Sequence, residues 1–326
     1  MDTSSCVGGV SVVVPLYNKS TTVAACISSL ISQTVSPKEI IVIDDGSTDD
    51  SYDIAVNILK KSSIPYIAKQ QKNSGVAAAR NLGAEISSSD YVSFLDADDQ
   101  WDKNFLCELI NLVNTYPHAV LYSCSHRVNS EFGLRTGVSK VLPEGGTALL
   151  EDFFSVYAKT SLVNSSKVLI PRTRFFEVGG FPAGVVVNED VFLWIQLALT
   201  GSVAYVQKDL VTINQFFDLS RAQRVAKLPF VIDYYSRNTN LLKEIKGLRK
   251  FVWRVCYSSF FQQLTTSRRI AWLFLKRIFI IFPVKALFLI VWFVIPRPFL
   301  RILVEARKGR WNFRRNVSAI KPTHLP

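Results

Sequence analysis

The sequence predicts an α/β fold built on a largely parallel, doubly wound sheet, followed by a basic and apolar helical tail. Three observations support this prediction. Short apolar runs alternate with helical patterns through the first hundred residues. Polar clusters follow several of these runs, where the carboxyl ends of parallel strands hold ligands. The charge also changes sign along the chain, from an acidic body to a strongly basic end.

The first strand is expected over Val10–Val14, an apolar run that ends at Pro15. The later strands are expected at Glu39–Ile43, Ile64–Ala68, Tyr91–Leu95, His118–Tyr122, Val168–Ile170 and Val203–Ile213. The helices are expected at Ser20–Gln33, Thr48–Lys61 with Ser47 as its cap, Val76–Ile86, Lys103–Asn114 and Asn188–Leu199. Residues 129–165 show no clear period.

Composition sets outer bounds on the class of protein. The chain has 326 residues, of which 48% are hydrophobic, so it can bury a large core. Its five cysteines are odd in number and show no C-x-x-C spacing, which argues against a disulfide framework and fits a reducing compartment. The first ten residues carry no basic segment and no long apolar run, so we expect no secretory signal.

Charge divides the chain into two expected regions. Residues 1–218 hold 16 Lys and Arg against 23 Asp and Glu, a net charge of −7. Residues 219–326 hold 22 basic against 3 acidic residues, a net charge of +19. We therefore expect an acidic body over 1–218 and a separate basic, helical region over 219–326.

Phe94–Asp99 is the strongest local signal, because an apolar run leads into three acids, Asp96, Asp98 and Asp99. Carboxylates repel a phosphate ester, but they hold Mg²⁺ or Mn²⁺, which bridges to phosphate oxygens. Asp is also common in turns at strand ends. Repulsion among charges this close favours a bound cation over a plain turn.

Asp44 and Asp45 follow the strand expected at Glu39–Ile43. A carboxylate in this place accepts hydrogen bonds from ribose hydroxyls or from a base, and Gly46 permits close backbone approach. A turn followed by a helix cap explains Gly46 and Ser47 equally well, but it does not explain two adjacent acids.

Arg80 is the only basic residue between Lys72 and Lys103. One interpretation is that its guanidinium contacts a donor phosphate. The other is a structural ion pair with Asp45 or Asp98. The sequence leaves both interpretations open.

Glu189 and Asp190 open an apolar helical pattern after a Gly-Gly-Phe turn at 179–181. A carboxylate near a helix N-terminus stays ionised through the helix dipole, which suits a general base. Helix capping by Asn188 and Asp190 is the competing interpretation.

Taken together and in this order, these pieces resemble the family 2 glycosyltransferases with the GT-A fold. The resemblance covers about residues 8–215, and its set of motifs is specific although each motif alone is weak. The matching stretches are Val12–Asn18, Ile43–Asp49, Gly75–Gly83, Phe94–Asp98 and Gly179–Trp194. The resemblance implies a GT-A domain with a mostly parallel sheet and an inverting, metal-dependent transfer from a nucleotide sugar. Its relatives include enzymes of bacterial cell-surface polysaccharide synthesis.

The resemblance also implies a role for each matching residue. It implies a donor site formed by Pro15, Leu16, Tyr17, Asp44, Asp45, Arg80, Asp96 and Asp98. Asp98, with Asp96, would bind the cofactor, Mn²⁺ or Mg²⁺. Asp190, with Glu189 beside it, would take the proton from the acceptor hydroxyl as the nucleoside diphosphate leaves.

One position departs from the family pattern. Many relatives carry His or Arg shortly after the strand that matches Val203–Ile213, whereas this chain has Asn214 and Gln215. Arg221 or a basic residue of the tail would have to replace that contact, and the sequence does not choose between them.

The tail shows the pattern of a basic amphipathic helix, which typically lies in a membrane interface. One half of the helix carries Arg268, Arg269, Lys276 and Arg277, interrupted by Trp272 and Leu273. The other half carries Ile270, Phe274, Ile278 and Ile281. The run at 278–295 is long enough to span a bilayer, but it is interrupted by Pro283 and Lys285 and flanked by cations. We therefore expect monotopic or re-entrant attachment to the membrane rather than a span or a soluble tail.

The expected partners are a nucleotide-sugar donor, a saccharide or lipid-linked acceptor, and the cytoplasmic face of the cell membrane. Nucleic acid is not expected, because the tail is rich in Phe, Leu, Ile and Trp rather than polar.

Three other functions fit the sequence less well. A nucleotidyltransferase also needs acids and a metal, but it usually has a basic phosphate loop, and Pro15–Thr22 offers only Lys19. An inactive sugar-nucleotide-binding scaffold at the membrane conflicts with the intact acids at 96, 98, 189 and 190. A NAD-binding Rossmann enzyme is disfavoured because no G-x-G-x-x-G follows the first strand.

Overall fold

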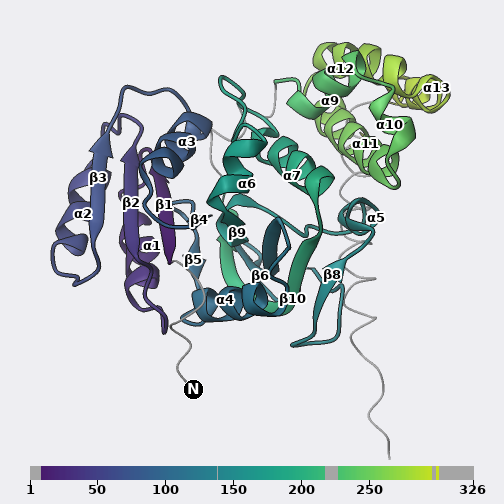
Figure 1. Ribbon diagram of the computed structural model, residues 1–326. Coiled ribbons are helices and arrows are strands. Elements are labelled where there is room, and N and C mark those ends of the chain that lie inside the picture. Colours follow the sequence, from purple (N-terminus) through teal and green to yellow (C-terminus); the bar gives the residue numbers. More distant parts are fainter. Residues whose placement is uncertain (1–8, 138, 217–226, 296–298, 301–326) are drawn as a thin grey trace, which may run out of the picture. The chain divides into compact units, whose positions relative to one another are not determined.

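The computed structural model describes residues 9–137, 139–216, 227–295 and 299–300 (Figure 1). The chain divides into two compact units. The first comprises residues 1–231 and 245–251, and the second comprises residues 232–244 and 252–326. The expected domain limit at residue 218 stays a prediction.

A ten-stranded sheet forms the centre of the first unit. Its parallel half has the strand order β3-β2-β1-β4, which Figure 1 shows side by side. These strands are β1 (Val10–Leu16), β2 (Glu39–Asp44), β3 (Tyr66–Gln70) and β4 (Tyr91–Phe94). Because β1, β2 and β4 run parallel, their carboxyl ends meet at one edge of the sheet, as expected for a doubly wound fold.

The other half of the sheet is mixed. β9 (Val168–Pro171) is antiparallel to both β4 and β6 (Leu121–Ser130). β10 (Val203–Asn214) is parallel to β6. Three short strands complete the sheet: β5 (Gln100–Trp101) and β8 (Thr147–Leu150), both antiparallel to β10, and β7 (Gly133–Arg135), antiparallel to β6.

Helices cover both faces of the sheet. On one face, α1 (Val23–Ile31), α2 (Ser51–Leu59) and α4 (Phe105–Thr115) bury their apolar sides in the main core with alternate residues of β1 and β2. On the other face lie α3 (Val76–Ile86), α6 (Arg172–Glu177) and α7 (Glu189–Thr200). There, Phe94 of β4 packs against Phe175 and Phe181, and Phe181 packs against Trp194.

Most expected elements of this unit are present, and α3 begins and ends at the expected residues. The cap assigned to Ser47 is wrong: α2 begins at Ser51, and the Ser47 hydroxyl instead donates to Asp44. The strand expected from His118 begins at Leu121, because a turn bond from Ala119 N to Tyr116 O precedes it. The patternless segment contains β7, β8 and α5 (Phe153–Tyr157), followed by the short helix η1 (Ser165–Lys167).

Among the described residues after β10, the elements are helices of different lengths. They are α9 (Phe230–Arg237), α10 (Leu241–Glu244), α11 (Leu248–Thr266), α12 (Arg268–Ile281), α13 (Pro283–Ile290) and η2 (Val291–Phe293). The Ser267 side chain caps α12 by accepting from Ile270 N at 3.4 Å. The spanning candidate at 278–295 is not one helix, because Pro283 starts a new helix at its first position. Within the described residues, no helix combines the length and apolar character needed to cross a membrane.

The face of α12 expected to meet lipid is also corrected. Phe274, Ile278 and Ile281 are buried within the protein. The exposed apolar side chains are Trp272 and Leu273, with Phe279 and Ile280. The helical period of α12 was predicted correctly. Its more continuous apolar half, however, packs inside the protein.

Candidate donor and base site

Two loops at the carboxyl ends of β1 and β2 are joined by hydrogen bonds. Asn18, in the left-handed region at φ 50°, donates its N–H to Ser47 Oγ at 3.0 Å. Its Oδ1 accepts from Thr48 N at 2.8 Å, and Lys19 N donates to Ser51 Oγ at 2.6 Å. These bonds fix the loops that flank the expected nucleoside site.

The residues expected to line the donor site from β1 differ in exposure. Pro15 and Leu16 are buried, and Leu16 belongs to the main core. The Tyr17 side chain follows them and is 46% exposed. Of the three, Tyr17 therefore offers a side chain to a ligand.

Asp44 ends β2 and Asp45 follows it, and both acids are held by the backbone and side chains around them. Asp44 Oδ2 accepts from Gln70 Nε2 at 3.0 Å. Asp45 Oδ1 accepts from Ser74 N at 2.7 Å, and its Oδ2 accepts from Gly75 N at 2.8 Å. Asp45 thus places its negative charge at the N-terminus of α3, where the helix dipole favours it.

The three acids after β4 have different environments. The side chains of Asp96 and Asp98 are each 34% exposed, and each contacts a cation. Asp99 is buried and accepts from Ser166 Oγ at 2.6 Å and from Asn214 N at 2.9 Å. Burial, Asp96 and Asp98 raise the pKa of Asp99 well above its usual value. Asp96 and Asp98 are therefore the two whose side chains reach solvent, and Asp99 anchors the turn.

Arg80 joins the acids after β4 to those of α7. Its Nη2 lies 2.6 Å from Asp96 Oδ1, and its Nη1 lies 3.3 Å from Glu189 Oε1. The guanidinium lies over the Phe181 ring, 5.1 Å from its centroid. Burial lowers the pKa of Arg80, but Asp96 and Glu189 outweigh it and raise the pKa overall. The prediction that Arg80 pairs with Asp45 or Asp98 is therefore wrong, since its partners are Asp96 and Glu189. The buried face of α3 directs the Arg80 side chain toward β4 and α7.

Glu189 and Asp190 are the first two residues of α7. Asn188 precedes them with φ 63° and makes no capping bond with its side chain, so its expected capping role is wrong. Burial and Asp190 raise the pKa of Glu189 to about 7, against the opposing charge of Arg80. Burial also raises the pKa of Asp190, again opposed by Arg80. The pair therefore titrates closer to neutral pH than ordinary carboxyls, which suits proton transfer.

Sequence reasoning missed two residues that hold the acidic turn. Asn214 Nδ2 donates to Asp98 O at 2.6 Å, so the residue at the departing family position anchors the turn. Ser166 accepts from Asp96 N at 3.2 Å as well as donating to Asp99. The departure from the family pattern at Asn214 drew attention to this residue but did not give its role. No local sequence pattern indicated Ser166. Arg221, the expected substitute, lies outside the described residues.

The residues present fit a metal that arrives with its substrate. No group of three or more His, Cys, Asp or Glu side chains in the described ranges forms a complete metal cage. Mg²⁺ is, however, usually bound by one or two carboxylates together with substrate phosphates. Asp96 and Asp98 supply two half-exposed carboxylates of this kind.

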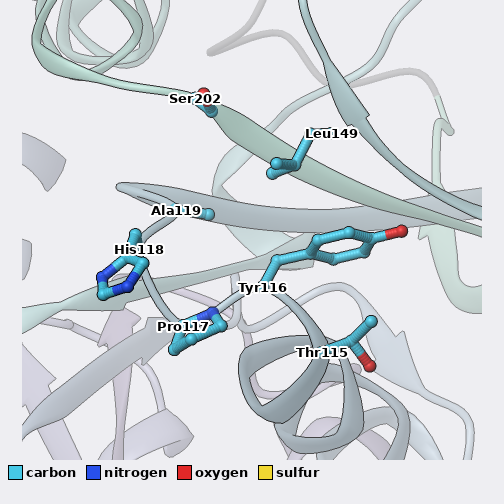
Figure 2. A pocket seen from close by; sticks show the side chains of 7 residues that line it. All are labelled: Thr115, Tyr116, Pro117, His118, Ala119, Leu149 and Ser202. Atoms are coloured by element: carbon cyan, nitrogen blue, oxygen red, sulfur yellow. The ribbon is translucent and has the colours of Figure 1, made fainter.

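A shallow cavity of about 220 Å³ lies elsewhere in the first unit, and Figure 2 shows its lining. Tyr116, Leu149 and Ser202 are among the residues around it. Ser202 immediately precedes β10, whereas Asn214 ends β10 and contacts the acidic turn. The cavity therefore lies at the opposite end of β10 from the acidic turn.

Comparison with known proteins decides the family. The family model described as Glycosyl transferase family 2 matches residues 11–175. The chain belongs to this family. The match spans the acids after β2 and β4 and also Arg80, so the glycosyltransferase expected from the sequence is confirmed.

Two relatives illustrate the range of this glycosyltransferase family. The chain is 31% identical over 228 residues to the Escherichia coli UDP-Glc:alpha-D-GlcNAc-diphosphoundecaprenol beta-1,3-glucosyltransferase WfaP, covering 67% of this chain and 85% of that one. It is 31% identical over 205 residues to an uncharacterized glycosyltransferase of Rickettsia conorii. That match covers 63% of this chain but spans about a third, 32%, of the Rickettsia protein.

Solved structures establish the fold of this glycosyltransferase. Staphylococcus aureus TarS 1-349 in complex with UDP-GlcNAc superimposes with a TM-score of 0.64 at 19% identity. The match covers 80% of this chain and 76% of that one. The expected α/β fold with a GT-A sheet is thereby confirmed.

Proposed function

We propose that the protein is a metal-dependent, inverting glycosyltransferase that moves a sugar from a UDP-sugar to a saccharide acceptor carried on a lipid. The observation that carries this proposal is the Arg80 guanidinium, which contacts Asp96 at 2.6 Å and Glu189 at 3.3 Å. One rigid cation thus joins the acids expected to hold the donor to the acids expected to activate the acceptor.

The donor side is formed by residues after β1, β2 and β4. Tyr17 offers an exposed ring to the nucleobase, and Asp44 and Asp45 support the ribose side. Asp98, with Asp96, would hold Mn²⁺ or Mg²⁺. The bound metal would neutralise charge on the leaving diphosphate. The structure of TarS with UDP-GlcNAc and the name of the E. coli relative support a uridine donor.

The acceptor side is formed by the first turn of α7. Asp190 takes the proton from the acceptor hydroxyl, and the acceptor oxygen forms a bond to the anomeric carbon. The bond from that carbon to the diphosphate oxygen breaks, and the nucleoside diphosphate leaves with the electron pair. A single displacement inverts the configuration at the anomeric carbon. Glu189 and Arg80 position the base, and the raised pKa of Asp190 brings it closer to the working pH.

The acceptor proposal rests on a relative and on the tail. The E. coli relative is named for a diphosphoundecaprenol-linked sugar, which is a lipid-linked acceptor. Many large apolar side chains of α12, α13 and η2 are exposed: Trp272, Leu273, Phe279, Ile280, Val284, Leu287, Phe288, Ile290 and Val291. Lys276 and Lys285 are exposed among them. Such a surface suits peripheral attachment to an anionic leaflet on the cytoplasmic side.

A donor and acceptor screen with the purified full-length protein tests the proposal. UDP-Glc, UDP-GlcNAc and other UDP-sugars would be offered with polyprenyl-diphosphate-linked saccharides, and UDP release and acceptor mass would be measured. Turnover should vanish in EDTA and return with Mn²⁺ or Mg²⁺. Asp98→Asn should lower kcat/KM by about 10²-fold or more, because it weakens charge neutralisation at the leaving group.

Asp102→Asn is the matched control. The Asp102 side chain is also 34% exposed and also contacts a cation, Arg127, at 3.5 Å. This substitution should leave turnover near that of the unaltered protein. Full activity in chelator would contradict the metal role, and a product with retained anomeric configuration by NMR would contradict inversion.

A further inference from the structure

The Lys19 ammonium lies 2.7 Å from Asp98 Oδ2, on the carboxylate that would receive the metal. The two side chains are 30% and 34% exposed, so water and small solutes reach the pair. Partly exposed ion pairs of this kind contribute little to stability. Their contact is therefore easily exchanged for another.

The backbone of Lys19 is fixed although its ammonium is not enclosed. Its N–H donates to Ser51 Oγ at 2.6 Å. Its carbonyl accepts from Thr22 N at 3.0 Å and from Val23 N at 2.9 Å. The flexible four-carbon stem is thus the part that can redirect the charge.

The neighbouring cation behaves differently. The Arg80 side chain is only 5% exposed and contacts both Asp96 and Glu189. Arg80 is built into the protein on two sides, whereas Lys19 reaches Asp98 from a surface loop. Of Arg80 and Lys19, Lys19 has the more exposed side chain and is the one able to exchange its contact with the acid.

We propose that Lys19 is an exchangeable counter-ion that occupies Asp98 until the metal binds and then turns to a phosphate oxygen of the donor. The inference rests on the proposed metal-dependent function. A divalent cation on Asp98 repels the ammonium, and the incoming diphosphate attracts it. With this exchange, a cation lies beside Asp98 both before and after the metal binds, which limits the repulsion between Asp96 and Asp98.

Two measurements on Lys19→Met have opposite expected signs. Without donor, the variant should bind Mn²⁺ about two- to fivefold more tightly, because a competing cation of an exposed pair is gone. With saturating Mn²⁺, it should bind UDP about two- to tenfold more weakly, because a charge-assisted contact to phosphate is lost. Free Mn²⁺ measured by EPR gives the first affinity, and calorimetry with UDP gives the second. A purely structural role for Lys19 would not produce opposite signs.

Three variants serve as controls. Lys19→Arg keeps the charge and should stay close to the unaltered protein in both measurements. Lys208→Met removes a similar ion pair, 2.6 Å from Glu108, away from the acids and should change neither affinity. In Asp98→Asn, adding Lys19→Met should no longer tighten Mn²⁺ binding, because the competed carboxylate is absent.

The outcomes separate the inference from the function on which it rests. Unchanged or weaker Mn²⁺ binding by Lys19→Met would overturn the counter-ion role. Tighter Mn²⁺ binding with unchanged UDP affinity would overturn the transfer to phosphate. If the unaltered protein binds no Mn²⁺ even with UDP, the metal dependence itself is wrong, and the role of Lys19 is overturned with it.

Discussion

At the scale of single residues, Glu189 and Asp190 are adjacent in the chain but have different surroundings. Glu189 is buried and contacts Arg80. Asp190 is partly exposed, and its Oδ1 accepts from Val191 N at 2.7 Å. Glu189 contacts the Arg80 guanidinium directly, so it is placed to position its neighbour, and we assign the proton acceptor to Asp190.

The first residue-scale prediction separates these roles. Asp190→Asn should leave UDP affinity unchanged but lower kcat by about 10²–10⁴-fold, the usual worth of general-base catalysis. Glu189→Gln should lower kcat less, because it weakens the contact with Arg80 without removing the base. Steady-state kinetics and UDP calorimetry on both variants provide the measurements. A nearly active Asp190→Asn beside an inactive Glu189→Gln would reverse the assignment.

The second residue-scale prediction concerns pH. A carboxyl accepts a proton only after losing its own, so kcat/KM should rise with pH along a limb above the usual carboxyl range, because burial raises the pKa of both Asp190 and Glu189. Arg80 opposes this rise in pKa, so Arg80→Met should move the ascending limb to higher pH. Arg80→Lys keeps the charge and should move it less. An unchanged limb in Arg80→Met would contradict the electrostatic link.

At the scale of elements, α3, the helix that carries Arg80, packs closely on β1. Gly83 of α3 packs directly on Val13 of β1, and a Cβ added at Gly83 would lie 2.3 Å from Val13 Cγ1. Gly83 and Val13 both belong to packed secondary structure, so neither residue can shift freely to make room for an added methyl group. The absence of a side chain at Gly83 therefore allows α3 to approach the sheet closely.

We predict that Gly83→Ala destabilises the protein. The overpacked methyl group should cost about 1–3 kcal/mol in the free energy of unfolding, despite the better helix propensity of Ala. Denaturant unfolding measures this change. Glu85→Ala, on the exposed side of the same helix, is the control and should change stability by less than about 0.5 kcal/mol. Equal stability of the two variants would contradict the packing argument.

Elements with a strong local period were predictable, and those shaped by distant contacts were not. The bounds of α3 were predictable from its helical spacing of small residues, because its buried face is continuous. The start of α2 was misplaced because Asn18, a residue of another loop, binds Thr48 and holds the preceding segment out of the helix. β7 and β8 have three and four residues, which is too short for a period to be seen.

The same distinction applies to the site. Asp96, Asp98 and Glu189 stand out locally, because acids rarely follow apolar runs in such clusters. The partners of Arg80 were not predictable, since Glu189 is separated from it by 109 residues. Ser166 likewise holds the turn from 67 residues beyond Asp99. Fold topology, rather than local pattern, brings such residues together.

At the scale of the whole molecule, the second unit carries many large apolar side chains that are exposed. Trp272, Leu273 and Phe288 are 45%, 54% and 72% exposed. Lys285 lies over the Trp253 ring, 4.7 Å from its centroid, so this cation borders the apolar surface. Exposed apolar surface beside cations is typical of proteins that bind the membrane interface.

We predict that Leu273→Asp with Phe288→Asp reduces binding to vesicles of anionic lipid by at least about tenfold, because both apolar insertion and charge attraction are weakened. Co-sedimentation with vesicles measures binding, and circular dichroism checks folding. High salt should weaken binding of the unaltered protein only in part, since it screens charge but not apolar burial.

Phe132→Asp is the control for this prediction. Phe132 is 93% exposed, but it lies in the turn between β6 and β7 of the first unit. Its substitution should leave vesicle binding unchanged. Equal binding by the double variant and the unaltered protein would contradict membrane attachment through α12 and α13.

The short strands at the margins of the sheet have a consequence for how copies of the protein meet. Among the described residues, one margin is β3, which has five residues and presents Lys69 to solvent. The opposite margin is shared by β5, with two residues, and β8, with four. A long, flat and apolar edge would recruit a strand from a second chain and seed aggregation, and these margins offer none. Copies at high local concentration can therefore collide often without joining their sheets through these margins.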